Sequence, residues 1–191
     1  MRTIGVLAGA FNPLTRAHVA LVDAGLEIVE DVVCVVPRNY PHKEFEGARF
    51  EDRLAMLERA GLHHFVSEGG LFIDIARELR RARPDAEVHF LCGRDAAERV
   101  LGWDYGAPGA AERMLDEFGL LVAARQGEFT APEHLRPRVR SIPMRGDFND
   151  VSSTEVRRRI ARGEAWEHLV PEAIVDLVRG IYAGARSSVR R

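Results

Sequence analysis

The feature that most constrains the fold is the alternation of short apolar runs with longer amphipathic ones. Residues 31–37 and 86–93 are apolar at nearly every position, which is typical of strands buried on both faces. Between such runs, apolar residues recur at helical spacing, for example over residues 71–83. Strands that alternate with helices favour a parallel sheet covered by helices. The sequence therefore predicts an α/β fold with a doubly wound, mostly parallel sheet and helices on both faces.

The expected elements follow one another without a long linker. Strands are expected at residues 3–11, 31–37, around 65, 86–93, 120–125 and 138–144. Helices are expected at residues 16–28, 49–62, 71–83, 110–118, 153–163 and 171–182, the first of them capped by Thr15. We therefore expect a single domain over residues 1–184 and a disordered tail over residues 185–191.

Composition narrows the class of partner. The 191 residues include 27 Lys and Arg against 29 Asp and Glu, for a net charge of −2, so no global charge favours nucleic acid or an anionic membrane. No apolar run is long enough to span a bilayer. Cys34 and Cys92 lie inside apolar runs and are interpreted as core thiols, which favours a reducing compartment. We expect a cytoplasmic protein that binds small molecules, and we leave open whether it forms a homo-oligomer.

The stretch "GAFNPLTRAH", residues 9–18, indicates a phosphate site. Gly9 lets the backbone approach a ligand closely, and Pro13 stiffens the turn. His18 falls in the first turn of the helix, next to the positive end of the helix dipole. The alternative interpretation of His18 is an ordinary surface histidine.

The stretch "VSSTEVRRR", residues 151–159, has two interpretations. Ser152 and Glu155 have the spacing of a capping box, which requires only a well-started helix. The functional interpretation adds the hydroxyls of Ser153 and Thr154 and the guanidinium of Arg157, which can bind phosphate oxygens in a bidentate manner.

The third stretch, "FLCGRDAAERVLGWD", places a glycine and a carboxylate after a strand. Gly93 permits close approach of a ligand, and Asp95 is placed to accept hydrogen bonds from ribose hydroxyls. Alternatively, Asp95 caps the following helix. Trp103 is either a core residue or an exposed stacking surface.

Together, the first two stretches resemble the two signature motifs of a nucleotidyltransferase superfamily, histidine-x-glycine-histidine and I-S-S-T-x-[I/V]-R. Within it the chain looks most like bacterial nicotinate mononucleotide adenylyltransferases. The further matches are "PHK" at 41–43, "RLAMLERA" at 53–60, Gly93 with Asp95, Trp103, and "HLVPEAIVDLV" near the end, so that the resemblance runs from residue 4 to about 183. It implies a Rossmann-like fold and a reaction of NAD biosynthesis. In that reaction the 5′-phosphate of a pyridine mononucleotide attacks the α-phosphorus of ATP and releases pyrophosphate.

The resemblance also implies roles for individual residues. His18 would contact the α-phosphate, Thr15 a neighbouring phosphate oxygen, and Lys43 would supply a counter-charge. The β- and γ-phosphates would be held by Ser152, Ser153, Thr154 and Arg157. The nucleotide would be bound by Gly9, Ala10, Phe11, Asn12, Gly93 and Asp95, and Trp103 would stack on the base of the second substrate. Mg²⁺ would arrive with ATP, since a hydrated ion held mainly by phosphates needs few protein ligands; no site for a permanent metal is expected.

Two departures from the family pattern keep the acceptor open. Thr15 and Ala17 stand where the family motif has histidine and glycine, as Thr does in the related phosphopantetheine adenylyltransferases. The chain also lacks the family's Ser/Tyr/Thr run that recognises the nicotinate carboxylate. The alternatives are an adenylyltransferase for phosphopantetheine or another phosphorylated acceptor, and a nucleotide-binding protein without turnover. Nicotinate and nicotinamide are not distinguished.

Overall fold

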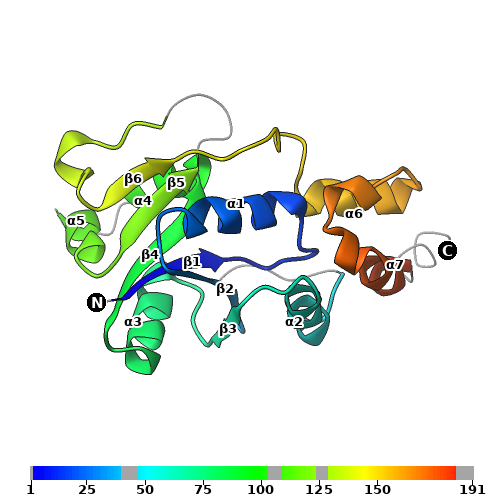
Figure 1. Cartoon of the computed structure of the whole chain (residues 1–191), viewed down its shortest axis with the longest axis horizontal. Coiled ribbons are helices and arrows are strands. Elements are labelled where there is room, and N and C mark those ends of the chain that lie inside the picture. Colours follow the sequence, from blue (N-terminus) through cyan, green and yellow to red (C-terminus); the bar gives the residue numbers. More distant parts are fainter. Residues whose placement is uncertain (1, 40–46, 103–108, 124–128, 184–191) are drawn as a thin grey trace.

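The expected alternation of strands and helices is confirmed. The computed structural model describes residues 2–39, 47–102, 109–123 and 129–183 (Figure 1). Its strands are β1 (Arg2–Ala8), β2 (Asp31–Pro37), β3 (His64–Ser67), β4 (Ala86–Gly93), β5 (Gly119–Ala123) and β6 (Val139–Ile142). Its α-helices are α1 (Arg16–Leu26), α2 (Phe50–Arg59), α3 (Phe72–Ala82), α4 (Arg94–Gly102), α5 (Ala110–Leu115), α6 (Ser153–Arg162) and α7 (Val175–Ala183). Three 3₁₀ turns, η1 (Glu133–Leu135), η2 (Glu167–Leu169) and η3 (Glu172–Ile174), complete the described elements.

The six strands form one parallel sheet in the order β3-β2-β1-β4-β5-β6. This is the Rossmann-like arrangement, in which the chain builds outward from β1 in one direction and then returns to build outward in the other. The sheet is therefore doubly wound, as the sequence predicts, and the winding reverses between β1 and β4.

Helices cover both faces of the sheet and enclose two apolar cores. One face packs against α1, α2, α6 and α7 and contains Leu7, Leu91 and Cys34, whereas the other packs against α3, α4 and α5 and contains Val6, Phe90 and Cys92. Both cysteines are buried thiols, as expected. Within the described ranges, no helix combines the length and the apolar character needed to cross a bilayer.

Several boundaries differ from the expected ones. β1 ends at Ala8 rather than at residue 11, because the backbone of Phe11 turns into the left-handed region. The helix expected over residues 171–182 is divided into η3 and α7. α4 begins at Arg94, directly after β4, so Asp95 lies inside its first turn and the alternative interpretation of Asp95 as a helix cap is wrong.

Candidate active site

The strand order brings the carboxyl ends of β1 and β4, where the sequence predicts the site, to one edge of the sheet. In doubly wound sheets, ligands bind outside the carboxyl ends of the strands, at the point where the winding reverses. Here that point lies between β1 and β4, and the pairing of Val6 with Phe90 brings their carboxyl ends, Ala8 and Gly93, to the same edge. Figure 1 shows α2, α6 and α7 grouped at the end of the molecule toward which β1 runs.

The turn between β1 and α1 has an unusual backbone. The Gly9 N–H donates to the Val35 carbonyl at 3.0 Å, which continues the pairing of β1 with β2 by one residue. Phe11 has φ 49°, a left-handed conformation that costs a non-glycine residue about 1–3 kcal/mol and persists only when its surroundings hold it. The Asn12–Pro13 peptide bond is cis. Non-glycine residues in the left-handed region cluster at functional sites, so the conformation of Phe11 makes this turn a candidate ligand-binding loop.

Helix α6 holds two carbonyl groups of this turn. The Ser153 hydroxyl donates to the Pro13 carbonyl at 2.7 Å, and the Arg157 guanidinium donates to the Asn12 carbonyl. Arg157 Nη2 also lies 3.5 Å from Thr154 Oγ1. Two motifs some 140 residues apart in sequence therefore form one structural unit. Arg157 is only partly buried, and a guanidinium has five N–H donors, so it can bind the turn and still have donors for a ligand.

Helix α2 holds a third carbonyl of the turn through Arg53, which the sequence analysis missed. Arg53 is only 5% exposed, and its Nη1 donates to the Ala10 carbonyl at 3.3 Å. Its guanidinium also lies 5.3 Å from the centre of the Phe50 ring. In a trans peptide the N–H points opposite to the C=O, so the Phe11 N–H is directed away from Arg53. Carbonyl oxygens repel phosphate, and three of those in the turn are bound by donors from α2 and α6.

Thr15 and His18 form a capping box at the start of α1. The Thr15 backbone N–H donates to His18 Nδ1 at 3.0 Å, and Thr15 Oγ1 lies 2.9 Å from the same nitrogen. Because a backbone N–H can only donate, Nδ1 must accept, and a neutral His18 carries its proton on Nε2. Thr15 is 0% exposed, so in this structure its hydroxyl contacts His18, and its expected contact with a phosphate oxygen stays a prediction.

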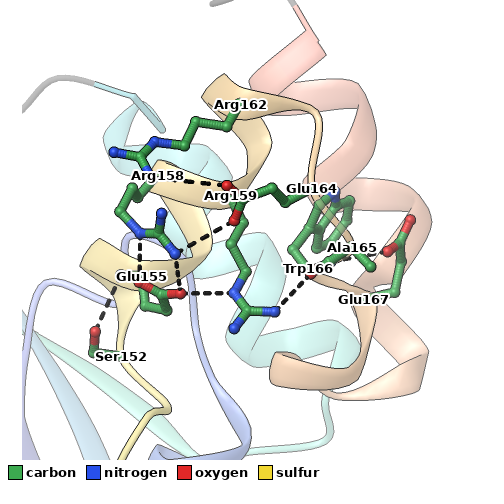
Figure 2. A network of polar contacts seen from close by, with 9 residues as sticks. All are labelled: Ser152, Glu155, Arg158, Arg159, Arg162, Glu164, Ala165, Trp166 and Glu167. Atoms are coloured by element: carbon green, nitrogen blue, oxygen red, sulfur yellow. Dashed lines mark hydrogen bonds and ion pairs between the residues drawn. The ribbon is translucent and has the colours of Figure 1, made fainter.

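Figure 2 shows a network of polar contacts that includes Arg158 and Arg159, the two arginines that follow Arg157 on α6. Ser152 Oγ accepts from the Glu155 N–H at 3.1 Å, as a helix cap should. The Glu155 carboxylate, however, accepts from Arg158 and Arg159 at 2.6 Å, so it is engaged by arginines rather than by the Ser152 backbone N–H that a full capping box would use. Hydrogen bonds from these two arginines lower the pKa of Glu155 to about 2. Two of the three consecutive arginines are therefore paired with a carboxylate, and Arg157 is the one that reaches the turn.

Gly93 ends β4, and Asp95 follows it in the first turn of α4. They line a cavity of about 540 Å³ together with Arg94, Arg99 and Asn149. A Cβ atom at Gly93 would have no neighbour within 4 Å, so the protein leaves open space there. Asp95 is exposed, which allows it to accept hydrogen bonds from a ligand. Among the described residues, the lining of this cavity includes neither His18 nor Arg157.

Asn12 does not direct its side chain toward this cavity. It is 4% exposed, and its Oδ1 accepts from the Ala48 N–H at 3.1 Å and from the Tyr182 hydroxyl.

Sequence analysis missed Tyr182, because nothing local relates it to the turn. Arg53 had a signal: it shares one helix face with the buried Met56 and Leu57, and a charged residue on an apolar face is informative.

Two of the expected site residues, Lys43 and Trp103, lie outside the described residues. Within the ranges that the structure does describe, no group of three or more His, Cys, Asp and Glu side chains is placed to hold a metal ion.

Comparisons with known proteins show the family of the chain. Residues 6–159 match the model of the family described as cytidylyltransferase-like. A probable nicotinate-nucleotide adenylyltransferase of Rubrobacter xylanophilus is 30% identical over 98% of this chain and 94% of its own length. A second one, from Gloeobacter violaceus, is 29% identical over 94% of this chain and 95% of its own length.

The fold matches solved structures as well. A Plasmodium falciparum nicotinic acid mononucleotide adenylyltransferase complexed with NaAD superposes with a TM-score of 0.72, covering 94% of this chain and 96% of that chain at 18% identity. The same enzyme complexed with APC gives a TM-score of 0.69 at 17% identity, covering 96% of this chain and 98% of that chain. At this identity the likeness establishes the fold.

Proposed function

The chain belongs to the cytidylyltransferase-like family of nucleotidyltransferases, together with the nicotinate-nucleotide adenylyltransferases, and from this premise we propose that it transfers the adenylyl group of ATP to nicotinate mononucleotide. The observation that carries the proposal is the turn over residues 9–15. Its carbonyl groups are bound by Arg53, Ser153 and Arg157, and it ends at the N-terminus of α1 beside His18. Such a turn suits the phosphates of a nucleotide.

The chemistry needs no protein nucleophile. A phosphate monoester has its second pKa near 6 and is mostly dianionic at neutral pH. One of its oxygens forms a bond to the α-phosphorus of ATP, while the bond from that phosphorus to the bridging oxygen breaks and pyrophosphate leaves. The protein has to align two highly charged groups and neutralise the charge that develops on them.

We assign roles accordingly. His18 donates from Nε2 to the α-phosphate, and the start of α6, with Ser152, Ser153, Thr154 and Arg157, faces the β- and γ-phosphates. Gly93 and Asp95 receive the adenosine ribose. Lys43 supplies a counter-charge and Trp103 stacks on the base of the second substrate, as the family resemblance implies. The proposal also includes a hydrogen bond between Thr15 and a phosphate oxygen. ATP brings Mg²⁺, which neutralises phosphate charge when bound.

The experiment that tests the proposal measures pyrophosphate release from ATP and Mg²⁺ with a panel of acceptors. The panel contains nicotinate mononucleotide, nicotinamide mononucleotide, phosphopantetheine and no acceptor. We expect release to depend on nicotinate mononucleotide. Release with phosphopantetheine alone would show that phosphopantetheine, not nicotinate mononucleotide, is the acceptor. Thr15 is compatible with that outcome, because the related phosphopantetheine adenylyltransferases also have threonine at this point of the motif. ATP binding without release for any acceptor would favour a non-catalytic nucleotide-binding protein.

A further inference from the structure

A buried hydrogen bond joins the C-terminal helix to the proposed phosphate-binding turn. Tyr182, in the last turn of α7, donates its hydroxyl to Asn12 Oδ1, although the two residues are 170 positions apart. Both side chains are nearly inaccessible, at 3% and 4% exposure. Hydrogen bonds in such surroundings are costly to break, because the acceptor that loses its donor stays buried.

The orientation of the Asn12 amide follows from its second partner. The Ala48 backbone N–H lies 3.1 Å from Oδ1, and a backbone N–H can only donate. The oxygen of the amide must therefore face Ala48, and the Tyr182 hydroxyl, which meets the same oxygen, must donate as well. Burial raises the pKa of Tyr182 above its ordinary value, so the hydroxyl keeps its proton throughout the physiological range.

The space around this hydrogen bond is filled. Gly47 has φ 109°, and a Cβ atom there would lie 2.9 Å from Asn12 Oδ1 and 3.0 Å from Tyr182 Cε1. The backbone before α2 thus packs directly against the pair, and only glycine fits at this position. The close approach of Gly47 limits how far either side chain can shift on that side.

Asn12 is also held through its main chain, because its carbonyl accepts from Arg157 of α6. Its side chain and its backbone are therefore fixed from two different helices. The residue lies between the left-handed Phe11 and the capping residue Thr15, so any displacement of Asn12 moves the peptide groups of the whole turn.

We propose that Tyr182 is a positioning residue for nucleotide binding, whose hydroxyl fixes the side chain of Asn12 and, through it, the turn that receives the phosphates of ATP. This inference rests on the proposed function, since it takes the turn to be a phosphate site. Because Tyr182 is only 3% exposed, we assign it an indirect action: it keeps the turn in its binding conformation before ATP arrives, which lowers the cost of ordering it.

The test removes only the hydroxyl. Tyr182→Phe is compared with the unmodified protein for the Kd of Mg²⁺ with an ATP analogue that has a methylene group between the α- and β-phosphates. We expect the Kd to rise roughly three- to tenfold, the factor that corresponds to about 0.5–1.5 kcal/mol for one buried hydrogen bond. In turnover, the KM for ATP should rise by the same factor while the KM for nicotinate mononucleotide stays unchanged.

A matched control separates positioning from the packing of α7. Val178 is 0% exposed on the same helix and packs in the same core, and its side chain has no atom that could hydrogen-bond to Asn12. Val178→Ala should lower the midpoint of thermal unfolding at least as much as Tyr182→Phe and leave the Kd for the analogue unchanged. An equal loss of affinity in Val178→Ala would assign the effect to helix packing and overturn the proposal.

A double-mutant cycle tests whether Tyr182 acts through Asn12. Once Asn12→Ala has removed the acceptor, Tyr182→Phe should weaken binding no further. Additive losses, or analogue binding at the unmodified level in Tyr182→Phe alone, would refute the inference while leaving the proposed function intact. If the unmodified protein does not bind the analogue at all, the proposed function itself fails.

Discussion

At the scale of the residue, the hydrogen bonds of Thr15 decide which nitrogen of a neutral His18 carries the proton. The bonds to Nδ1 leave Nε2 with the proton and hold the ring at the start of α1. The ring is further supported by an edge contact with Phe11, at 5.2 Å between ring centres. A threonine in place of the family's first histidine therefore has a physical role here: it orients the histidine that follows.

This arrangement predicts how much kcat falls in variants of His18 and Thr15. We expect His18→Ala to lower kcat at least tenfold, about 1.4 kcal/mol of transition-state stabilisation, because the donor is removed. Thr15→Val keeps the backbone donor and loses the hydroxyl, so kcat should fall by roughly three- to tenfold. Thr15→Ser keeps both the backbone donor and the hydroxyl, so its kcat should be close to that of the unmodified enzyme. Steady-state kinetics check the series, and wild-type turnover in His18→Ala would falsify the role of His18.

At the scale of the element, α6 is organised by Glu155. Its carboxylate binds Arg158 and Arg159, and Arg159 also donates to the Ala165 carbonyl at 3.0 Å, which ties the helix to the segment that follows it (Figure 2). The arginines depress the pKa of Glu155 from 4.5 to about 2. The ionised carboxylate is therefore more stable in the folded protein than in the unfolded chain. The resulting stability is present above pH 4.5 and is lost as the pH falls toward 2.

Glu155→Gln should therefore lower the midpoint of thermal unfolding at pH 7, and the difference from the unmodified protein should shrink as the pH is lowered. Thermal unfolding followed by circular dichroism between pH 7 and pH 3 measures this. Asp176→Asn is a suitable control, since its carboxylate also bonds an arginine at helical spacing but is 90% exposed. A difference that is equal at both pH values would contradict the assignment.

At the scale of the whole molecule, Asp31 joins the amino ends of several strands at the edge opposite the candidate site. Its carboxylate lies 3.0 Å from His63 Nδ1, 3.2 Å from Arg83 Nη1 and 4.0 Å from Arg2 Nη2. Burial raises its pKa, but the hydrogen bonds of His63 and Arg83 outweigh burial, and the pKa is lowered below 3.8. The stability that this carboxylate contributes is thus present above pH 3.8 and lost as the pH falls through its lowered pKa.

We expect Asp31→Asn to destabilise the protein by roughly 2 kcal/mol at pH 7, or about 4–8 °C in Tm. The matched control is Glu30→Gln, because Glu30 pairs with Arg2 at 3.8 Å with both side chains about 60% exposed, and such a surface pair contributes little. Denaturant unfolding at pH 7 and near pH 3 checks both variants. A loss in Asp31→Asn that persists unchanged in acid would reject the ionic explanation.

The sequence by itself determined the class of fold and the position of the two motifs. β2 over residues 31–37 and α6 over residues 153–162 lie where the pattern predicts them, since apolar periodicity and helix caps act within a few residues of chain. The division of the last helix at Val175 and the early end of β1 were missed. Both depend on how the chain packs beyond its local pattern.

Only the tertiary structure decided what holds the site. Arg53 reaches a carbonyl 43 positions away and Tyr182 a side chain 170 positions away, which requires the order of the strands and the docking of α2 and α7. Glu155 is different, because it binds arginines three and four positions along its own helix, a local contact that competes with the capping contact that the sequence predicts. A local pattern specifies which residues can donate or accept. Which donor meets which acceptor depends on packing between distant segments, because a hydrogen bond forms only when the whole fold brings both partners within about 3 Å.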